Sequence, residues 1–273
     1  MHITIIVSSL LVIVNILSMN AQFHFPFGEE LKKVVQKDTS PKKVFVLGVY
    51  ASAIHAKWID NNGKVLIRAI AVASEPCIFW RGDFEEAKDI LSRINIPNGY
   101  GYLIPADTSF NGPSGRSLDE NYLDPLGFTR NDAWLCDLVP HSCQNSSQKS
   151  ALEREYDIYM KQNILPVYDM PEVPADLASD ERIQEIIKEL KQSNADTIIL
   201  LGDQPVKYFL AKFSDKYNKL SDFKKYGKPV NVTIDNKFYT IIALAHPRQV
   251  SKLGKSNQKW YDLHQTWMKE KLK

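Results

Sequence analysis

The amino-acid sequence predicts an α/β protein: a three-layer α/β/α sandwich built on a central, mostly parallel sheet of four strands. Four short apolar runs alternate with stretches of helical spacing, which is typical of a parallel sheet covered by helices on both faces. These runs are residues 44–47, 133–139, 197–201 and 239–245. The chain has 273 residues, 44% hydrophobic and 24% charged, a composition that allows a sizeable core and excludes disordered and collagen-like proteins.

The first predicted strand, Val44–Leu47, is closed by Gly48, and a hairpin follows it. Residues 56–60 and 64–72 flank Asn61-Asn62-Gly63, whose Asn-Gly pair suits a tight turn between two antiparallel strands. We expect this hairpin to be an insertion beside the main sheet.

In the middle of the chain, segments with weak helical spacing of apolar residues alternate with segments whose composition is typical of loops. Residues 84–94 have the spacing of a short helix, whereas 97–115 is rich in glycine and proline and is expected to be a loop. A weak helix over 118–126 precedes the second strand, 133–139. Residues 144–178 are polar and without clear periodicity, so we expect an irregular segment there.

The clearest helix follows this irregular segment. Ser179 is a favourable N-cap, two acidic residues occupy the first turn, and apolar residues recur at helical spacing from Ile183 to Leu190. The third strand leads into a helix with Pro205 in its first turn. The fourth strand ends in His246-Pro247.

Polar residues gather at the carboxyl ends of the predicted strands, which is where open parallel sheets bind ligands. They are Tyr50, Ser52, Asp137, His141, Asp203 and His246. Several common chemistries lack their motifs: there is no glycine-rich dinucleotide or phosphate loop and no serine-hydrolase elbow. Three cysteines without a C-x-x-C pair exclude a disulfide-dense scaffold, and we expect no metal site.

The N-terminal 18 residues contain no Lys, Arg, Asp or Glu and are mostly apolar. We divide the chain into this segment (1–18), a lead-in (19–41) and one domain (42–273). The apolar run is too short for a stable transmembrane helix, so we expect no stable membrane association. Two alternatives stay open: a signal peptide cleaved near Ala21, giving a secreted or periplasmic protein, or a true start at Met19, giving an intracellular one.

Three segments carry a resemblance to a known family. The middle one is Phe110-Asn111-Gly112-Pro113-Ser114-Gly115, followed by Leu118-Asp119 and the strand 133–139. Val44–Ser52 precedes it, and Ile241–Pro247 follows it. This ordered set resembles the uracil-DNA glycosylase superfamily and is most similar to its branch with an iron–sulfur cluster. The resemblance implies a uracil-DNA-glycosylase-like sandwich from about residue 42 onwards.

The resemblance also implies roles for individual residues. Phe110 would stack on a base swung out of the duplex, because the glycosidic bond cannot be reached inside the helix. Asp137 stands where the family has an Asn that reads the edge of uracil. His246 would donate a hydrogen bond to an oxygen of the leaving base as negative charge develops there. The residues expected to contact DNA are Arg248, Gln249 and Lys252.

Two features depart from the family pattern. An acidic residue or Asn that orients water should follow the first strand, but here Gly48 is followed by Val49-Tyr50-Ala51-Ser52. We expect Tyr50 and Ser52 to serve as the catalytic groups that hold this water, with His55 or Asp107 as alternatives. The cysteines that bind the cluster are also absent, so we expect neither an iron–sulfur cluster nor any other cofactor.

Asp137 in place of Asn bears on the substrate. An amide both donates and accepts, whereas an ionised carboxylate only accepts and would face a uracil carbonyl unfavourably. We therefore expect excision of a damaged or deaminated base other than unmodified uracil. The missing acid motivates an alternative, a non-catalytic protein of the same fold that binds DNA or a nucleobase-like ligand. An unrelated α/β protein would be favoured if Phe110 and His246 were far apart.

The formal net charge of +2 conceals a basic C-terminal end. After the His-Pro pair, only Asp262 and Glu270 oppose seven basic residues, and this balance is compatible with binding to DNA phosphates. The basic residues are Arg248, Lys252, Lys255, Lys259, Lys269, Lys271 and Lys273. A solvated basic tail is the alternative. We expect duplex DNA as the partner and a monomeric protein.

Overall fold

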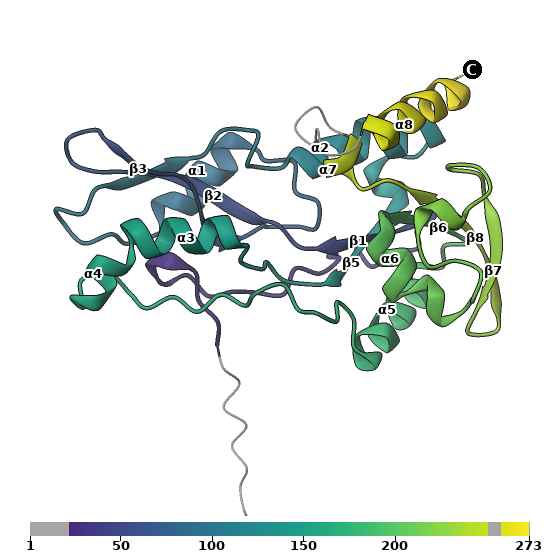
Figure 1. Ribbon diagram of the computed structural model, residues 1–273, viewed down its shortest axis with the longest axis horizontal. Helices are drawn as coiled ribbons and strands as arrows, with labels where there is room; N and C mark the ends of the chain where they lie inside the picture. The colour runs from purple at the N-terminus through teal and green to yellow at the C-terminus, as the bar shows by residue number, and fades with distance from the viewer. Residues whose placement is uncertain (1–21, 251–257, 273) are drawn as a thin grey trace, which may run out of the picture.

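The computed structural model describes residues 22–250 and 258–272. Two β-sheets lie towards opposite ends of an elongated molecule, and β1 runs from the larger sheet directly towards the smaller one (Figure 1). Within the described ranges, no helix is long and apolar enough to cross a membrane. The N-terminal segment 1–18 and Lys252 lie outside the described residues.

The larger sheet has five strands in the order β5-β1-β6-β8-β7. Four of them are parallel and correspond to the four apolar runs, so the predicted parallel sheet is confirmed. They are β1 (Val44–Tyr50), β5 (Ala133–Val139), β6 (Thr197–Leu201) and β8 (Lys237–Leu244). Most of their side chains are buried because helices cover the sheet on both sides.

The fifth strand, β7 (Val230–Ile234), was not predicted. It pairs antiparallel with β8 at the sheet edge, and its exposed and buried residues alternate. The turn between the two strands is Asp235-Asn236, with positive φ at both residues (47° and 65°). Such a two-residue turn is typical of a tight hairpin, so the sequence signal for β7 lay in the turn.

Helices cover the larger sheet on both sides. Helix α5 (Asp180–Ser193) packs on β1 and β5, and α8 (Gln258–Lys271) lies on the other side of the sheet (Figure 1). The predicted capping holds, since the Ser179 hydroxyl accepts the Arg182 N–H. Helix α6 (Asp203–Tyr208) follows β6 and contacts β1 and β6.

The predicted hairpin is confirmed and belongs to a second sheet of three antiparallel strands. Strands β2 (Ala53–Ile59) and β3 (Val65–Ser74) form the hairpin, and β4 (Tyr102–Pro105) pairs with β2. Strand β4 lies inside the stretch predicted as a loop. It was missed because it is only four residues long and glycines and prolines flank it. Helix α1 (Phe84–Ser92) packs near β4.

The smaller sheet has its own aromatic core. The rings of Phe27, Trp58 and Tyr156 meet edge to face, with centroids 5.2 to 5.9 Å apart. Tyr156 follows α3 (Ser146–Glu155), which lies in the segment predicted to be irregular. This helix was missed because few of its residues are apolar; its signal was the capping box of Asn145 and Gln148.

The remaining helices are short. The predicted helix over 118–126 begins earlier, with α2 (Pro113–Leu118), and continues through the π-helical η2 (Asp119–Leu123) and η3 (Asp124–Leu126). Other single turns are η1 (Pro26–Gly28), η4 (Arg130–Asp132), α4 (Asp157–Lys161), η5 (Leu210–Lys212), η6 (Leu220–Asp222) and α7 (Pro247–Val250).

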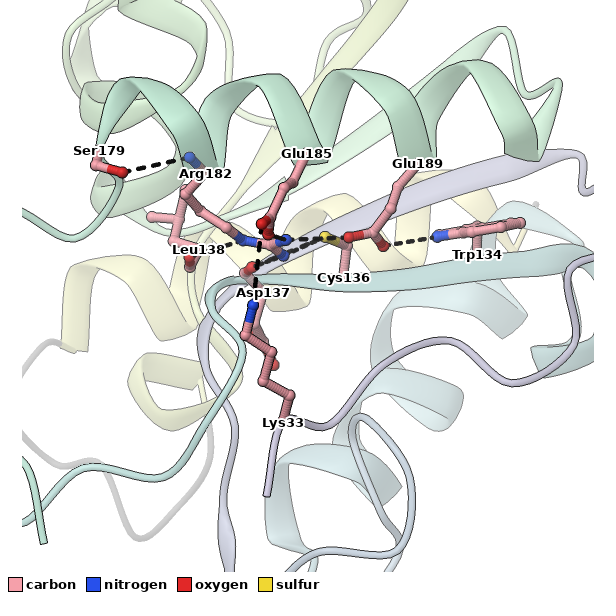
Figure 2. Close-up of polar contacts among 9 residues, drawn as sticks. All are labelled: Lys33, Trp134, Cys136, Asp137, Leu138, Ser179, Arg182, Glu185 and Glu189. Carbon is pink, nitrogen blue, oxygen red and sulfur yellow. Dashed lines mark hydrogen bonds and ion pairs between the residues drawn. The ribbon is translucent and has the colours of Figure 1, made fainter. Parts of the chain in front are cut away.

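The carboxyl end of β5 is fixed by Arg182 of α5, as Figure 2 shows. The guanidinium donates to the backbone oxygens of Asp137 (2.7 Å) and Leu138 (3.2 Å). It also pairs with Glu185 (2.9 Å) and Glu189 (3.1 Å), so the charge is compensated where it is mostly buried. These contacts hold the strand end that carries the Asp137 side chain.

Replacement of Arg182 by Met is expected to destabilise the protein by about 2–4 kcal/mol, because buried carbonyls and Glu189 lose their charged donor. Urea denaturation measures this change. Lys212→Met is the matched control, because it removes only an exposed ion pair with Asp180 and is expected to change stability by less than about 1 kcal/mol. Equal effects of the two substitutions would contradict the proposed importance of Arg182.

Candidate active site

The carboxyl ends of β1, β5 and β8 converge at one edge of the larger sheet. Tyr50 ends β1 and pairs with Val139 at the end of β5. Helix α2 contacts α7, and Figure 1 shows the two helices together above this edge. The loop containing Phe110 is therefore next to the turn containing His246, since each directly precedes one of these helices.

His246 is partly buried and lies two residues beyond Leu244, the last residue of β8. Its Nδ1 accepts the backbone N–H of Arg248 (3.1 Å), so the neutral ring carries its proton on Nε2. Burial, and secondarily the charge of Arg248, lowers the pKa of His246 to about 4. At neutral pH the side chain is thus an uncharged hydrogen-bond donor through Nε2.

A buried network fixes the backbone just before His246. The Tyr122 hydroxyl donates to the Ala245 carbonyl (2.6 Å), and the Tyr226 hydroxyl accepts the Ala245 N–H (2.9 Å). The Tyr226 hydroxyl also lies 2.6 Å from Nδ1 of His264, whose Nε2 lies 2.9 Å from the Asn121 carbonyl. Burial lowers the pKa of His264 to about 4, which keeps this ring neutral and the network intact at neutral pH.

The Phe110–Gly115 loop is held by backbone contacts that explain its glycines. A Cβ on Gly112 would lie 2.0 Å from the Arg81 carbonyl carbon, and one on Gly115 would lie 2.2 Å from the Phe79 oxygen. The loop therefore packs directly on residues 79–82, an approach that only glycine allows.

Polar side chains close the two ends of this loop. The Asn111 amide pairs with the His55 backbone in both directions (2.8 Å each), and Arg116 donates to the carbonyls of Arg81, Asn111 and Thr108. The Phe110 side chain between them is 44% exposed. This ring is thus presented to solvent on a rigid loop.

Asp137 lies at the centre of the edge. Its residue is only 3% exposed, and its partner across the β1–β5 ladder is Gly48. A Cβ on Gly48 would lie 2.2 Å from Asp137 Oδ1 and 2.7 Å from the Phe79 ring. The carboxyl group and the aromatic ring therefore meet over Gly48.

A model of the uracil DNA glycosylase superfamily matches residues 106–267, more than half of the chain. The chain belongs to the uracil-DNA glycosylase superfamily. No curated protein matches it.

The superfamily match confirms the resemblance that the sequence predicted, and the α/β architecture agrees with it. The matched part contains the Phe110 loop, Asp137 and His246. Strand β1 and all three strands of the smaller sheet precede it along the chain. The wall of the site that faces Gly48 is thus built from segments outside the match.

Glu75 and Phe79 are the two residues of this wall that the sequence did not predict. Glu75 directly follows β3 and is 5% exposed; Phe79 has a positive φ of 53° and covers Gly48. Their sequence signal was weak. Loops often contain an acidic residue beside a proline, as in Glu75-Pro76, with an aromatic residue such as Phe79 nearby. Only the tertiary contacts bring them to Asp137.

The Glu75 carboxylate connects the two sheets. Its Oε1 accepts the Ser52 N–H (3.2 Å) and its Oε2 accepts the Trp80 N–H (3.3 Å). Burial and the nearby charge of Asp137 raise the pKa of Glu75 well above its ordinary value. A buried acid thus lies against the segment Val49–Ser52, which itself contains no acidic residue.

The other predicted site residues lie around this edge, and their roles stay predictions. Tyr50 is 40% exposed, and the Ser52 side chain is exposed. The Arg248 side chain is exposed on α7, and the Gln249 Oε1 accepts the His246 N–H (2.9 Å). Lys252 falls outside the described residues.

The two alternatives for holding water are already engaged. His55 Nε2 lies 3.1 Å from the Gln148 amide nitrogen, and Asp107 forms a 2.7 Å ion pair with Lys57. In the part of the chain that the structure describes, no three His, Cys, Asp or Glu residues are grouped as metal ligands. Cys77, Cys136 and Cys143 are free thiols.

Gly48→Ala is expected to destabilise the protein by about 1–3 kcal/mol, because the added methyl group would collide with Asp137 and Phe79. Chemical denaturation measures the effect. Gly63→Asn is the control: Gly63 lies in the hairpin turn with no heavy atom within 4 Å of its Cβ position, and Asn tolerates its positive φ. A Gly48→Ala protein as stable as the control would contradict the described packing.

Proposed function

We propose that this protein hydrolyses the N-glycosidic bond of a damaged or deaminated base that has been flipped out of DNA. The observation that carries the proposal is the state of His246, a neutral imidazole with Nδ1 accepting a backbone N–H and Nε2 carrying the proton. Superfamily membership supports the same class of reaction. The DNA substrate and the base flipping are part of the proposal.

In this reaction water oxygen bonds to C1′ of the sugar while the C1′–N bond breaks. The electron pair of the broken bond leaves with the base, and the proton that water loses is taken up in the end by the released base, so the products are the sugar hydroxyl and the neutral base. His246 Nε2–H donates a hydrogen bond to the base oxygen on which the negative charge develops, an interaction that is strongest in the transition state. The network of Tyr122, Tyr226 and His264 keeps the preceding backbone in place for this donor.

Binding of the flipped nucleotide would use the groups around His246. Phe110 offers an exposed ring for stacking, and Asp137 offers a carboxyl group to the edge of the base. Tyr50 and Ser52 lie at the end of β1, where water would approach the sugar. Arg248 and Gln249 on α7, with Lys252 beyond it, would contact the strands beside the flipped base.

His246→Ala is expected to lower the rate of base release by about 10²–10³-fold, because the developing charge on the base loses its donor. Single-turnover assays with duplexes containing uracil, hypoxanthine, xanthine or an alkylated base measure the rate. His24→Ala is the control, since His24 lies in the N-terminal lead-in. Unchanged release by His246→Ala would refute the role of this residue.

The absence of an acid in Val49–Ser52 favours a second candidate, a non-catalytic protein that binds DNA or a nucleobase-like ligand in the same pocket. The same single-turnover assay distinguishes the two functions. Binding without base release, with protein in excess and at long times, would favour the second candidate. Release that depends on His246 would favour the glycosylase.

Binding to duplex DNA is expected to weaken as salt concentration rises, because basic side chains displace counterions from the phosphates. Arg248→Ala is expected to lower the slope of log affinity against log salt by about 0.9, the contribution of one phosphate contact. Fluorescence anisotropy at several salt concentrations measures the slope. Lys191→Ala, in an ion pair with Asp235 at the end of α5, should leave it unchanged.

A further inference from the structure

A groove lies between helix α8 and the segment 220–226, which begins with the single turn η6. Its volume is about 360 Å³, within the range of about 300–1,000 Å³ that is usual for sites of small ligands. Aromatic residues and lysines line it together: Phe223, Lys224, Lys225, Tyr226, Lys259 and Trp260. Among them the sequence predicted only Lys259, as part of the basic C-terminal end.

The aromatic wall of the groove is held in place by its surroundings. Trp267 also lines the groove and is 3% exposed, and its indole packs directly on Gly227, where a Cβ would lie 2.4 Å from Nε1. The Tyr226 hydroxyl accepts the Ala245 N–H (2.9 Å), and the Tyr226 ring centroid is 5.9 Å from that of Trp260. Because these side chains are already fixed, a ligand would bind with little further loss of side-chain freedom.

The charge of the groove is positive. Three lysines line it, and one of them, Lys225, pairs with Glu270 at 3.0 Å. Among the described residues, Lys224 and Lys259 have no acidic partner within ion-pair distance. Lys259 Nζ lies 5.7 Å from the centroid of the Trp260 ring, and this ring is only partly buried. Positive charge and an accessible aromatic ring therefore occur side by side.

This combination suits a nucleotide. Grooves that bind single-stranded nucleic acid combine basic side chains, which follow the phosphates, with aromatic rings on which the bases stack. A base is planar and can lie on Trp260, while its phosphate supplies negative charge for Lys224 and Lys259. A hollow of this size holds a single small ligand, so the nucleotide must be unpaired.

We propose that the groove beside α8 is a second nucleotide site, which holds one unpaired nucleotide of a DNA strand by stacking on Trp260 and by phosphate contacts with Lys224 and Lys259. The choice of DNA as the source of the nucleotide rests on the proposed function. Helix α8 contacts α7, which carries Arg248, and Figure 1 shows the two helices next to each other. The groove thus borders the helix that is proposed to contact DNA.

Fluorescence anisotropy with a labelled thymidine strand of about eight nucleotides tests the site, since this strand contains no damaged base and needs no base release. Trp260→Ala is expected to weaken binding at least about fivefold, because the stacking of one base is lost. Trp260→Phe keeps a ring and should retain most of the affinity. Phe238→Ala is the matched control, because Phe238 is an exposed aromatic residue of β8 outside the groove.

The salt dependence of the same binding tests the phosphate contacts. Replacement of both Lys224 and Lys259 by Ala is expected to lower the slope of log affinity against log salt by about 1.4, since each phosphate contact on a single strand contributes about 0.7. Lys212→Ala should leave the slope unchanged, because Lys212 lies outside the groove in an exposed ion pair with Asp180.

Three results would overturn the proposal. The first is an unchanged affinity in Trp260→Ala together with an unchanged slope in the double lysine variant. The second is a greater loss of strand binding in Phe110→Ala than in Trp260→Ala, which would place the strand in the base pocket. The third is binding of thymidine 5′-monophosphate as tight as that of the strand, which would make a free nucleotide the ligand. Failure of base release refutes the proposed function alone, and the binding measurements still decide the groove.

Discussion

The close approach of β1 and β5 at Gly48 is the constraint on which the site depends. Because Gly48 has no side chain, the Asp137 carboxyl group and the Phe79 ring can both lie directly over its Cα. Arg182 holds β5 from the opposite face, so the strand end cannot turn its carboxyl group away without losing buried hydrogen bonds. The position of the Asp137 carboxyl group is thus set by two neighbouring strands before any loop contributes to the site.

The two sides of the site are stabilised in different ways. Around His246, tyrosine hydroxyls and a neutral histidine satisfy the backbone at the end of β8, so that polar bonds set the position of the imidazole. Around Phe110, glycines let two backbone segments touch, and arginine side chains bind their carbonyls. Rigid backbone on both sides fits a site whose groups must be in place before a substrate arrives.

The sequence predicted those parts that local patterns determine. The four parallel strands have continuous apolar runs, and His246 follows one of them, so both their order and its place at the sheet edge could be inferred. The edge strand β7 and the helix α3 were missed because their residues are half exposed and their signals lie in a turn and a capping box. Glu75 and Phe79 could not be inferred, since they reach Asp137 only through the way the two sheets pack together.

The hydrogen bond from the Ser52 N–H to Glu75 connects the residue that follows β3 to the segment that follows β1, so the three-stranded sheet is not a detachable appendage of the larger sheet. A shortened chain that ends the insertion with a direct link from β1 to the Phe110 loop would lose Glu75 and Phe79 together, exposing Gly48 and Asp137 to water. The insertion is therefore under a geometric restraint at its inner end, next to the larger sheet. At its outer end the Asn61-Asn62-Gly63 turn is exposed, and no heavy atom lies within 4 Å of the Gly63 Cβ position, so no such restraint acts there.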